Sequence, residues 1–470
     1  MPDRLSALDA SLLYMDEPAT PMHVGSVAIF DRPQEGFGYE QLVTLINQRL
    51  PLLPRYRQRV LGVPAHLARP VWIDDVDFDV HYHVRRSALP APGTDEQLFE
   101  LVARLMARPL VIERPLWEIY LVEGLTDGRF ALVTKTHQSM IDGLGTIDLA
   151  QLILDAEPHR PDGEHDDANW LARKQPGVVK LLCDAIGETS RRPAELVENV
   201  RSAVNDFTAS ADRAGSALGG ALSTARAALF PSADSPLRAR TSTARMFAVA
   251  RTSLADYRAV RHSYGATVND VVLAVIAGGL RQWLLSRGVE LAPNTTVRAL
   301  VPLAVRDTDS GAPSPADVAG NEVDSQLVDL PVGESNPVVR LQHITHDMAE
   351  HGRSARSVGA APLLRLSGFA PATLHALGAR AAGAFSGRIF NVLVTNSPGP
   401  QESRYGGTAR LREMFPVMPL ARSQTLSIGV TSYAGGIYFG LNGDRKAVPD
   451  VATLAGMVED SLAELRGASW

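Results

Sequence analysis

The chain has a single cysteine, Cys183, among its 470 residues. One thiol cannot form an internal disulfide or a thiolate metal cluster, so nothing points to an oxidising compartment. A chain of this length buries a large core without cross-links. We therefore expect a cytoplasmic protein of about two or three domains.

Long apolar runs are also missing. No stretch approaches the roughly 18 consecutive apolar residues that a membrane-spanning helix needs. The N-terminal segment MPDRLSALDASLLYMDEP carries three aspartates and lacks the basic start and apolar core of a signal peptide. We expect this segment to stay on the mature protein and any membrane contact to be peripheral.

Excess positive charge is lacking as well. The chain has 46 basic and 52 acidic residues, a formal net charge of −6. Such a chain offers no basic field to gather the phosphates of nucleic acid, which we do not expect as a partner. Only four of the basic residues are lysines, so nearly every cation is a guanidinium.

Several familiar site motifs do not occur. The chain has no Walker loop, no Gly-x-Ser-x-Gly elbow and no His-Glu-x-x-His, and Gly143-Leu-Gly145 lacks the third glycine of a dinucleotide fingerprint. A nucleotide enzyme and a serine hydrolase are disfavoured. His81 and His83 alternate with apolar residues across 76–85, which predicts a strand with one solvated face more simply than a metal site. We predict no metal and no bound cofactor.

The pattern along the chain predicts two α/β halves. Residues 1–157 alternate strand-like and helix-like segments, with a strand over 22–30 and a helix over 39–50. Residues 158–245 begin with a polar linker and continue as Ala-rich stretches with helical spacing, which predicts a helical crossover.

Residues 246–470 alternate again. The pattern predicts helices over 269–287, 337–351 and 362–382, and strands over 296–302, 389–395, 425–433 and 436–440. Close internal repeats are not visible, so any kinship between the two halves is structural.

The segment with most chemical content is FALVTKTHQSMIDG, residues 130–143, a short apolar strand that ends in His137, Gln138, Asp142 and Gly143. Strand ends of this kind present reactive side chains. Taken alone, a histidine followed by Asp-Gly also fits an ordinary turn.

With its neighbours, this segment resembles the bacterial wax ester synthase/diacylglycerol acyltransferase family, a branch of the CoA-dependent acyltransferases. The resemblance covers nearly the whole chain. Its motifs, in order, are LSALDASLLYMDEPATPMHVG, Pro115-Leu116-Trp117, HQSMIDG, Asn269-Asp270, VPLAVR with Arg306, Gly320-Asn321, and Asn396-Ser397-Pro398-Gly399-Pro400.

The resemblance implies an α/β (α+β) fold of two chloramphenicol-acetyltransferase-like domains with mixed sheets, facing each other across a tunnel. It implies acyl-CoA as co-substrate, an apolar alcohol such as diacylglycerol as acceptor, and no acyl-enzyme. We then expect a cytoplasmic protein that associates peripherally with the surface of a membrane or lipid droplet.

The resemblance also implies residue roles. A histidine takes the proton from the acceptor hydroxyl as it attacks the thioester. Asp142, before Gly143, holds the motif loop by pairing with an arginine, for which Arg306 is the candidate. Residues expected to bind substrate or line the tunnel are Pro115, Leu116, Trp117, Asn269, Asp270, Arg306, Asn321, Asn396 and Ser397.

One position departs from the family pattern His-His-x-x-x-Asp-Gly. The second histidine, assigned as the base, is Gln138 here, and a carboxamide cannot accept a proton at neutral pH. Three explanations stay open: His137 has taken over the role, the chain is a lipid- or acyl-CoA-binding relative with low activity, or the glutamine is an engineered substitution.

Other motif residues have structural alternatives. Trp117 is either a packing anchor for the following strand or a ligand contact. Asn269-Asp270 opens a helix, so these residues either cap it or align the tunnel wall. Asn396-Ser397 is either the start of a rigid turn or a source of backbone donors that line the site.

Overall fold

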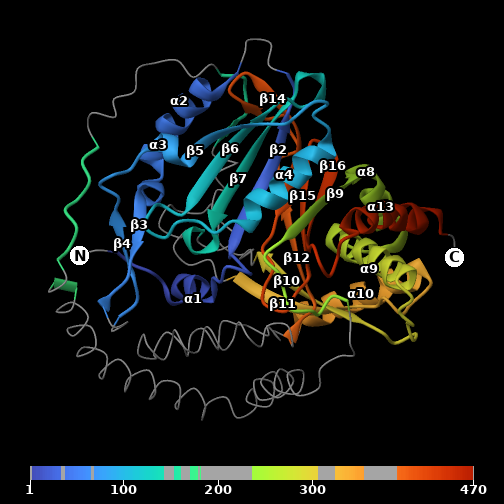
Figure 1. Cartoon of the computed structure of the whole chain (residues 1–470). Helices are drawn as coiled ribbons and strands as arrows, with labels where there is room; N and C mark the ends of the chain where they lie inside the picture. Colours follow the sequence, from blue (N-terminus) through green and yellow to red (C-terminus); the bar gives the residue numbers. More distant parts are fainter. Residues whose placement is uncertain are drawn as a thin grey trace.

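The computed structural model contains two mixed β-sheets side by side and a third, smaller sheet at one end (Figure 1). Each large sheet belongs mainly to one half of the chain, so the prediction of two α/β domains is confirmed. The structure describes residues 3–32, 37–64, 68–141, 153–159, 170–177, 180–181, 236–304, 323–353 and 389–468.

The N-terminal sheet has seven strands in the order β5-β6-β7-β2-β14-β13-β8. The first pair is parallel and the others are antiparallel. Its bounds are β2 His23–Phe30, β5 Val84–Ala88, β6 Trp117–Glu123, β7 Phe130–His137, β8 Leu154–Asp155, β13 Tyr405–Gly406 and β14 Ala409–Val417.

Two strands of this sheet come from the far end of the chain. β14 pairs antiparallel with β2, and β13 joins β14 to β8. The division at residue 246 therefore separates the chain in sequence, whereas residues 405–417 complete the sheet of the other half. This exchange ties the two domains together through backbone hydrogen bonds.

The C-terminal sheet has six strands in the order β11-β10-β12-β15-β16-β9. Parallel pairing joins β10, β12 and β15, and the remaining pairs are antiparallel. The bounds are β9 Arg245–Ser253, β10 Val297–Ala304, β11 Val323–Leu330, β12 Val392–Pro398, β15 Leu426–Tyr433 and β16 Gly436–Asp444.

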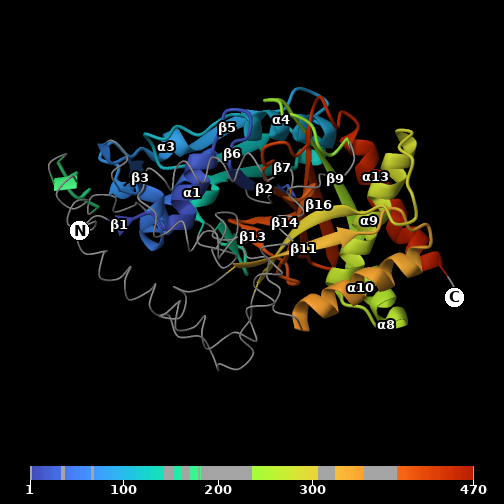
Figure 2. The same ribbon diagram turned by 90° about the horizontal axis from the view of Figure 1, so that it is seen from below.

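Four helices gather on one side of the C-terminal sheet (Figures 1 and 2). They are α8 Leu254–Tyr264, α9 Val268–Ser286, α10 Pro337–Arg353 and α13 Val451–Gly467. Helix α9 is long and apolar enough to cross a membrane, yet most of it is buried inside the domain. Its side chains from Val271 to Leu280 belong to the domain core, so α9 is a core helix.

The N-terminal domain has apolar cores on both faces of its sheet. One face packs against α1 Ala7–Met15 and α2 Tyr39–Arg49, and the other against α4 Asp95–Ala107. The core under α4 also contains Phe247 of β9 and Phe415 of β14, so it continues into the C-terminal half. Short turns are η1 Leu50–Leu52, η2 Pro54–Arg57, η4 Thr126–Gly128 and η5 Gln138–Met140.

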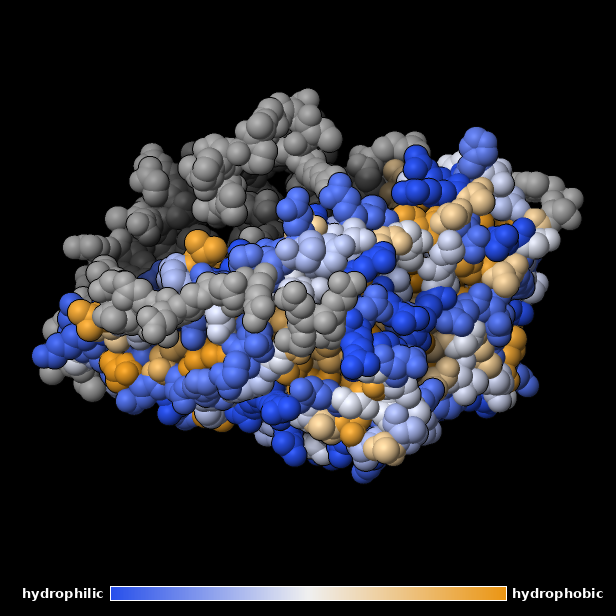
Figure 3. All heavy atoms as spheres, turned by 90° about the horizontal axis from the view of Figure 1, so that it is seen from above, coloured by the Kyte–Doolittle hydropathy of each residue, from blue (hydrophilic) through white to orange (hydrophobic). Residues whose placement is uncertain are grey.

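The third sheet lies at the outer end of the N-terminal domain. It has the order β1-β4-β3, with bounds β1 Asp3–Arg4, β3 Gln58–Leu61 and β4 Val71–Asp74. The face in Figure 3 shows apolar side chains scattered among hydrophilic ones.

The local prediction for residues 76–85 is wrong. The alternating segment 76–85 is not a single strand, because residues Val80–His83 form the short helix α3 before β5 begins. Asp79 caps α3 by accepting a hydrogen bond from the backbone N–H of His81 at 2.9 Å. His83 is fully buried and does not face solvent. The predicted helices of the crossover and of 362–382 lie outside the described residues.

Candidate functional site

His137 is the last residue of β7, and Gln138 is the first residue of η5. Antiparallel pairing of β7 with β2 places His137 directly opposite His23, with 6.0 Å between the ring centroids. The backbone N–H of His137 donates to the carbonyl of Leu116, which fixes the strand end against the Pro-Leu-Trp motif. Two motifs distant in sequence therefore meet at this strand end.

The imidazole of His137 is held by the residue two positions ahead. Its Nδ1 accepts a hydrogen bond from the backbone N–H of Ser139 at 3.1 Å and lies 2.7 Å from the Ser139 hydroxyl. A nitrogen that accepts an N–H carries no proton of its own. We therefore assign the neutral tautomer protonated at Nε2.

Asp16 lies on the other side of the same ring. Its Oδ2 is 3.6 Å from His137 Nε2, and its Oδ1 accepts the backbone N–H of Met22. The separation is longer than a hydrogen bond, but the carboxylate favours a protonated Nε2 facing it. Asp16 and Ser139 thus both favour the tautomer that carries its proton on Nε2.

The set Ser139, His137 and Asp16 contains the residue types of a nucleophilic triad, but not its proton path. A base at Nδ1 must become protonated when it takes the serine proton. The new N–H would then face the backbone N–H of Ser139. Since Nε2 already carries the ring proton, neither nitrogen of His137 is free to act as a base in this arrangement, and its side chain is only 1% exposed.

Gln138 is partly exposed, in contrast to His137. Its backbone N–H donates to the carbonyl of Met22, so the turn is anchored on the residue that precedes β2. Its side-chain Oε1 is buried and has no hydrogen-bond partner among the described residues. The carboxamide has an acceptor and a donor but cannot remove a proton.

A buried charged pair lies beneath the histidines on the same face of β7. Lys135 is 3.6 Å from Glu118 of β6 and donates to the carbonyls of Leu105 and Arg108, at the end of α4. Burial lowers the pKa of Lys135 to about 8, although Glu118 opposes the shift. The ammonium satisfies C-terminal carbonyls of the helix, which is a structural role.

His23 is the second imidazole of the site. Burial lowers its pKa well below 6.5, and the positive charge of Lys135 acts in the same direction. His23 is therefore neutral at physiological pH, and its Nε2 accepts the backbone N–H of Leu110 at 3.4 Å.

Trp117 is fully buried in the described structure. Its indole N–H donates to the carbonyl of Tyr56 at 2.8 Å, and its ring stacks on His83 with centroids 4.5 Å apart. His83 in turn donates from Nδ1 to the carbonyl of Trp117. These contacts fit the interpretation of Trp117 as a packing anchor better than that of a ligand contact.

The helix and strand motifs of the second domain meet each other. Asp270 accepts from the backbone N–H of Thr267 and donates its own N–H to the threonine hydroxyl, so it completes the N-terminal cap of α9. Asn269 accepts a hydrogen bond from Asn396 of β12 at 3.1 Å. Asn396 and Ser397 lie in the strand and not in a turn, because β12 stays paired with β15 as far as Pro398.

Four predicted site residues lie outside the described residues, namely Asp142, Gly143, Arg306 and Asn321. The proposed ion pair of Asp142 with Arg306 and the tunnel therefore stay predictions.

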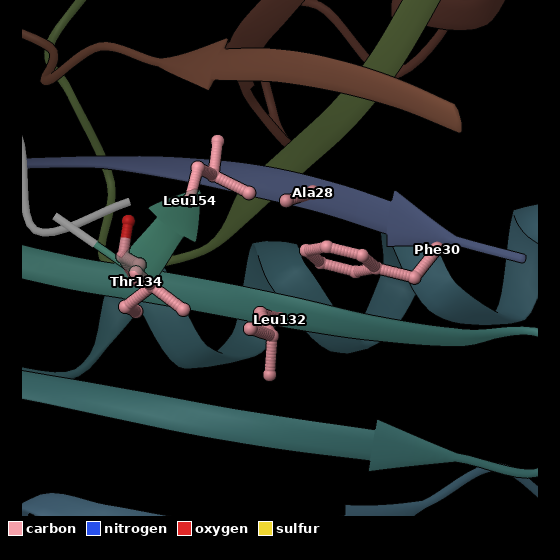
Figure 4. A pocket seen from close by; sticks show the side chains of 6 residues that line it. Ala28, Phe30, Leu132, Thr134 and Leu154 are labelled. Carbon is pink, nitrogen blue, oxygen red and sulfur yellow. The ribbon is translucent and has the colours of Figure 1, made fainter. Parts of the chain in front are cut away.

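Figure 4 shows a small apolar cavity beside Thr134 on β7, closed by Ile153 and Leu154. Its volume is about 10 Å³. It has room for about one water molecule and not for an acyl chain.

Three residues of this site were not singled out from the sequence: Asp16, His23 and Ser139. The first two belong to the opening motif, which carried no assigned role. His23 reaches His137 through the pairing of β2 with β7, a contact between residues more than 100 positions apart, and Asp16 directly follows α1, which packs against η5. Among the described residues, no group of three or more His, Cys, Asp or Glu side chains is arranged to hold a metal ion.

Comparison with known proteins places these motifs in a family. The model of the wax ester synthase/diacylglycerol acyltransferase catalytic domain matches residues 5–272, and the model of the WS/DGAT C-terminal domain matches residues 319–466.

Individual relatives agree with the family models. The probable diacylglycerol O-acyltransferase tgs2 of Mycobacterium tuberculosis is 35% identical over 99% of both chains. Its tgs3 is 48% identical over 56% of this chain and 97% of its own length. Among solved structures, the wax ester synthase/diacylglycerol acyltransferase from Marinobacter aquaeolei VT8 covers 98% of both chains at 26% identity and a TM-score of 0.67. The first condensation domain of the calcium-dependent antibiotic synthetase shares the fold, with 16% identity, a TM-score of 0.59 and coverage of 99% and 96% of the two chains.

Proposed function

Because the chain belongs to the wax ester synthase/diacylglycerol acyltransferase family, we propose that it transfers a long-chain acyl group from acyl-CoA to the hydroxyl of diacylglycerol or of a fatty alcohol. The product is a triacylglycerol or a wax ester. The observation that carries the proposal is the full-length match to named acyltransferases, with the HQSMIDG segment at the end of β7.

The reaction forms one bond, breaks one bond and moves one proton. The acceptor oxygen attacks the thioester carbon, the carbon–sulfur bond breaks, and the hydroxyl proton ends on the sulfur of CoA. In the family pattern a histidine at position 138 carries this proton. Gln138 can accept a hydrogen bond from the hydroxyl and donate one to a carbonyl, so it can position both reactants. It cannot carry the proton, and we expect turnover to be slow.

His137 serves this reaction as a positioning residue. Its ring is fixed by Ser139 and faces Asp16, so it supports the turn that presents position 138. This geometry favours the explanation that the base is missing over the explanation that His137 has replaced it. Asp142, paired with Arg306, would hold the other end of the motif loop.

The acceptor is insoluble in water, so the protein must meet it at a lipid surface. We propose that the protein acts from the cytoplasm as a peripheral protein at a membrane or lipid-droplet surface. Acyl-CoA is the soluble co-substrate, and the reaction needs no metal or bound cofactor.

A second candidate is a lipid- or acyl-CoA-binding protein of the same fold with little turnover. The specific observation in its favour is Gln138, together with the engaged Nδ1 and protonated Nε2 of His137. Binding and positioning of substrates do not require an imidazole at position 138, so both candidates predict that palmitoyl-CoA binds.

Thiol release separates the two candidates. The chain is incubated with palmitoyl-CoA and either dioleoylglycerol or hexadecanol, and free CoA is measured against a sample without acceptor. Acceptor-dependent release supports the transferase. Binding of palmitoyl-CoA without release, in the chain and in Gln138→His alike, would support the binding protein and overturn the transferase.

A further inference from the structure

We infer that the outer end of the N-terminal domain is the surface that docks on anionic phospholipid bilayers, through a basic pocket beside Trp72 and the exposed side chain of Leu171. This inference rests on the proposed use of a lipid acceptor. It adds where the protein meets the lipid surface and which headgroup chemistry it selects.

The pocket has a volume of about 190 Å³ and lies between β4 and residues 170–177 and 180–181. We call it the Trp72 pocket; the side chains around it are Trp72, Ile73, Asp74, Arg173, Lys174, Pro176 and Lys180. A single water needs about 10–15 Å³, so the pocket has room for a phosphate group.

The charge of the Trp72 pocket is positive, although the chain as a whole carries −6. Asp74 is the one acid among the described residues that line it, and Arg173 neutralises it through three hydrogen bonds of 2.9 to 3.1 Å. This pairing lowers the pKa of Asp74 to about 2. Lys174 and Lys180 have no ion-pair partner among the described residues, so two positive charges remain for a ligand.

These two residues are half of the four lysines in the chain. Both are exposed, as a headgroup contact requires. An ammonium binds a phosphate as a compact point charge without demanding the planar geometry of a guanidinium. A surface that must accept headgroups in many orientations is served by such flexible cations.

An apolar side chain stands next to the charges. Leu171 is 86% exposed, the largest exposed fraction among the large apolar side chains of the described structure. Its neighbour Trp170 is held by Arg57, whose guanidinium lies 5.0 Å from the ring centroid, and by Phe78. Leu171 is thus presented by an anchored segment, in the way an interfacial residue enters the acyl layer beneath the headgroups.

The position of the segment suits a docking surface. Figures 1 and 2 both show the green segment that contains residues 170–177 at the outer edge of the molecule, beyond β3 and β4. Two hydrogen-bonded contacts fix it there, from Arg173 to Asp74 and from Arg59 to Gln175. A flat bilayer can therefore approach this end without a clash with the C-terminal helices.

The charge contribution can be tested by flotation. Each basic residue near an anionic surface contributes about 1 kcal/mol, so neutralising two lysines should lower the partition coefficient about 30-fold. The experiment compares the full chain with Lys174→Gln/Lys180→Gln on vesicles of phosphatidylcholine alone and of phosphatidylcholine with phosphatidylserine. We expect the wild type to float mainly with the anionic vesicles and the double variant to lose most of that binding.

A matched control separates the pocket from net charge. Arg445→Gln/Lys446→Gln removes the same two charges from an exposed turn of the C-terminal domain and should float like the wild type. For the apolar contact, Leu171→Ser should weaken flotation on anionic vesicles, whereas Leu285→Ser, at an exposed position near the end of α9, should not.

Several results would overturn the docking surface. One is equal flotation of the wild type and the lysine variant, and another is equal loss in both charge variants. A third is normal flotation of the lysine variant with a raised KM for palmitoyl-CoA, which would assign the pocket to the phosphates of CoA. Thiol release measured in detergent, without vesicles, reports on the proposed function alone, so either idea can fail while the other stands.

Discussion

At the scale of single residues, Gln138 is the position where the local fold of the motif is kept and the proton acceptor is lost. The strand, the turn and the hydrogen bond from position 138 to Met22 are all present, and only the side chain lacks a proton acceptor. Binding should therefore survive where proton transfer does not.

We predict that Gln138→His raises turnover of palmitoyl-CoA with an acceptor by about 10²- to 10⁴-fold, the usual contribution of a general base. The KM for palmitoyl-CoA should change little, because the substitution adds proton transfer and not binding. Steady-state thiol release measures both parameters.

His137 supplies the control for this prediction. In the Gln138→His background, His137→Ala should lower turnover through a disordered turn, and His137→Asn should retain more activity because its amide can replace one ring contact. If His137→Ala abolishes turnover in the original chain while Gln138→His brings no gain, then His137 is the base and the assigned tautomer is wrong.

His83 makes a second residue-scale prediction, on stability. Burial lowers its pKa to about 4, whereas an unfolded histidine titrates near 6.5. The unfolded state therefore binds more protons between these values, so the stabilisation is complete above about pH 6.5 and is lost as the pH falls toward 4. The shift corresponds to about 3 kcal/mol.

Urea unfolding between pH 8 and pH 4 measures this dependence. The His83→Asn variant keeps a donor toward the Trp117 carbonyl but has no titrating group, so its stability should fall less steeply with pH. His262→Asn, at an exposed position of α8, should leave the slope unchanged. An unaltered slope in His83→Asn would mean that His83 titrates normally in the folded protein.

At the scale of elements, the start of α9 combines a helix cap with a contact between motifs. Thr267 and Asp270 exchange two hydrogen bonds, and Asn269 binds Asn396 of β12. The Asn-Asp motif therefore positions the core helix of the C-terminal domain against the end of its central strand.

We predict that Thr267→Ala lowers the free energy of unfolding by about 1 kcal/mol, the usual cost of a lost N-cap. Thr267→Ser keeps the hydroxyl and should stay close to the wild type. Denaturant titration of both variants tests the cap. A Ser variant as unstable as the Ala variant would attribute the effect to the threonine methyl group instead.

At the scale of the whole molecule, the strands β13 and β14 complete the sheet of the N-terminal domain, so we expect the two domains to unfold as one unit. Arg251 of β9 reinforces the junction, since it binds both carboxylate oxygens of Glu413 on β14 and also Asp95 at the start of α4. Its guanidinium lies 5.0 Å from the ring centroid of Phe415. Three elements from both halves of the chain meet at this side chain.

We predict that Arg251→Met lowers the thermal midpoint and keeps a single unfolding transition, because the methionine retains the apolar contact while Glu413 loses its partner. Arg86→Met removes an exposed ion pair with Glu123 inside one sheet and should change the midpoint little. Calorimetry distinguishes these cases. Two separate transitions in the wild type would contradict the single folding unit.

Much of the element pattern could be predicted from local sequence. The helix expected over 269–287 is Val268–Ser286, and the strand expected over 425–433 is Leu426–Tyr433. Apolar periodicity and capping residues are local signals, so they identify such elements without knowledge of their partners. Segment 76–85 shows the limit, because its alternation also fits a capped turn of helix that buries one imidazole.

The sequence by itself determined the family, through motifs whose order is written along the chain, and it identified position 138 as the departure. Only the tertiary structure decided what surrounds His137. His23 reaches it through the pairing of β2 with β7, Asp16 through the packing of α1 on η5, and the pairing of β14 with β2 joins the two domains. Strand pairing depends on which distant edge is available, and no local pattern of residues encodes that choice.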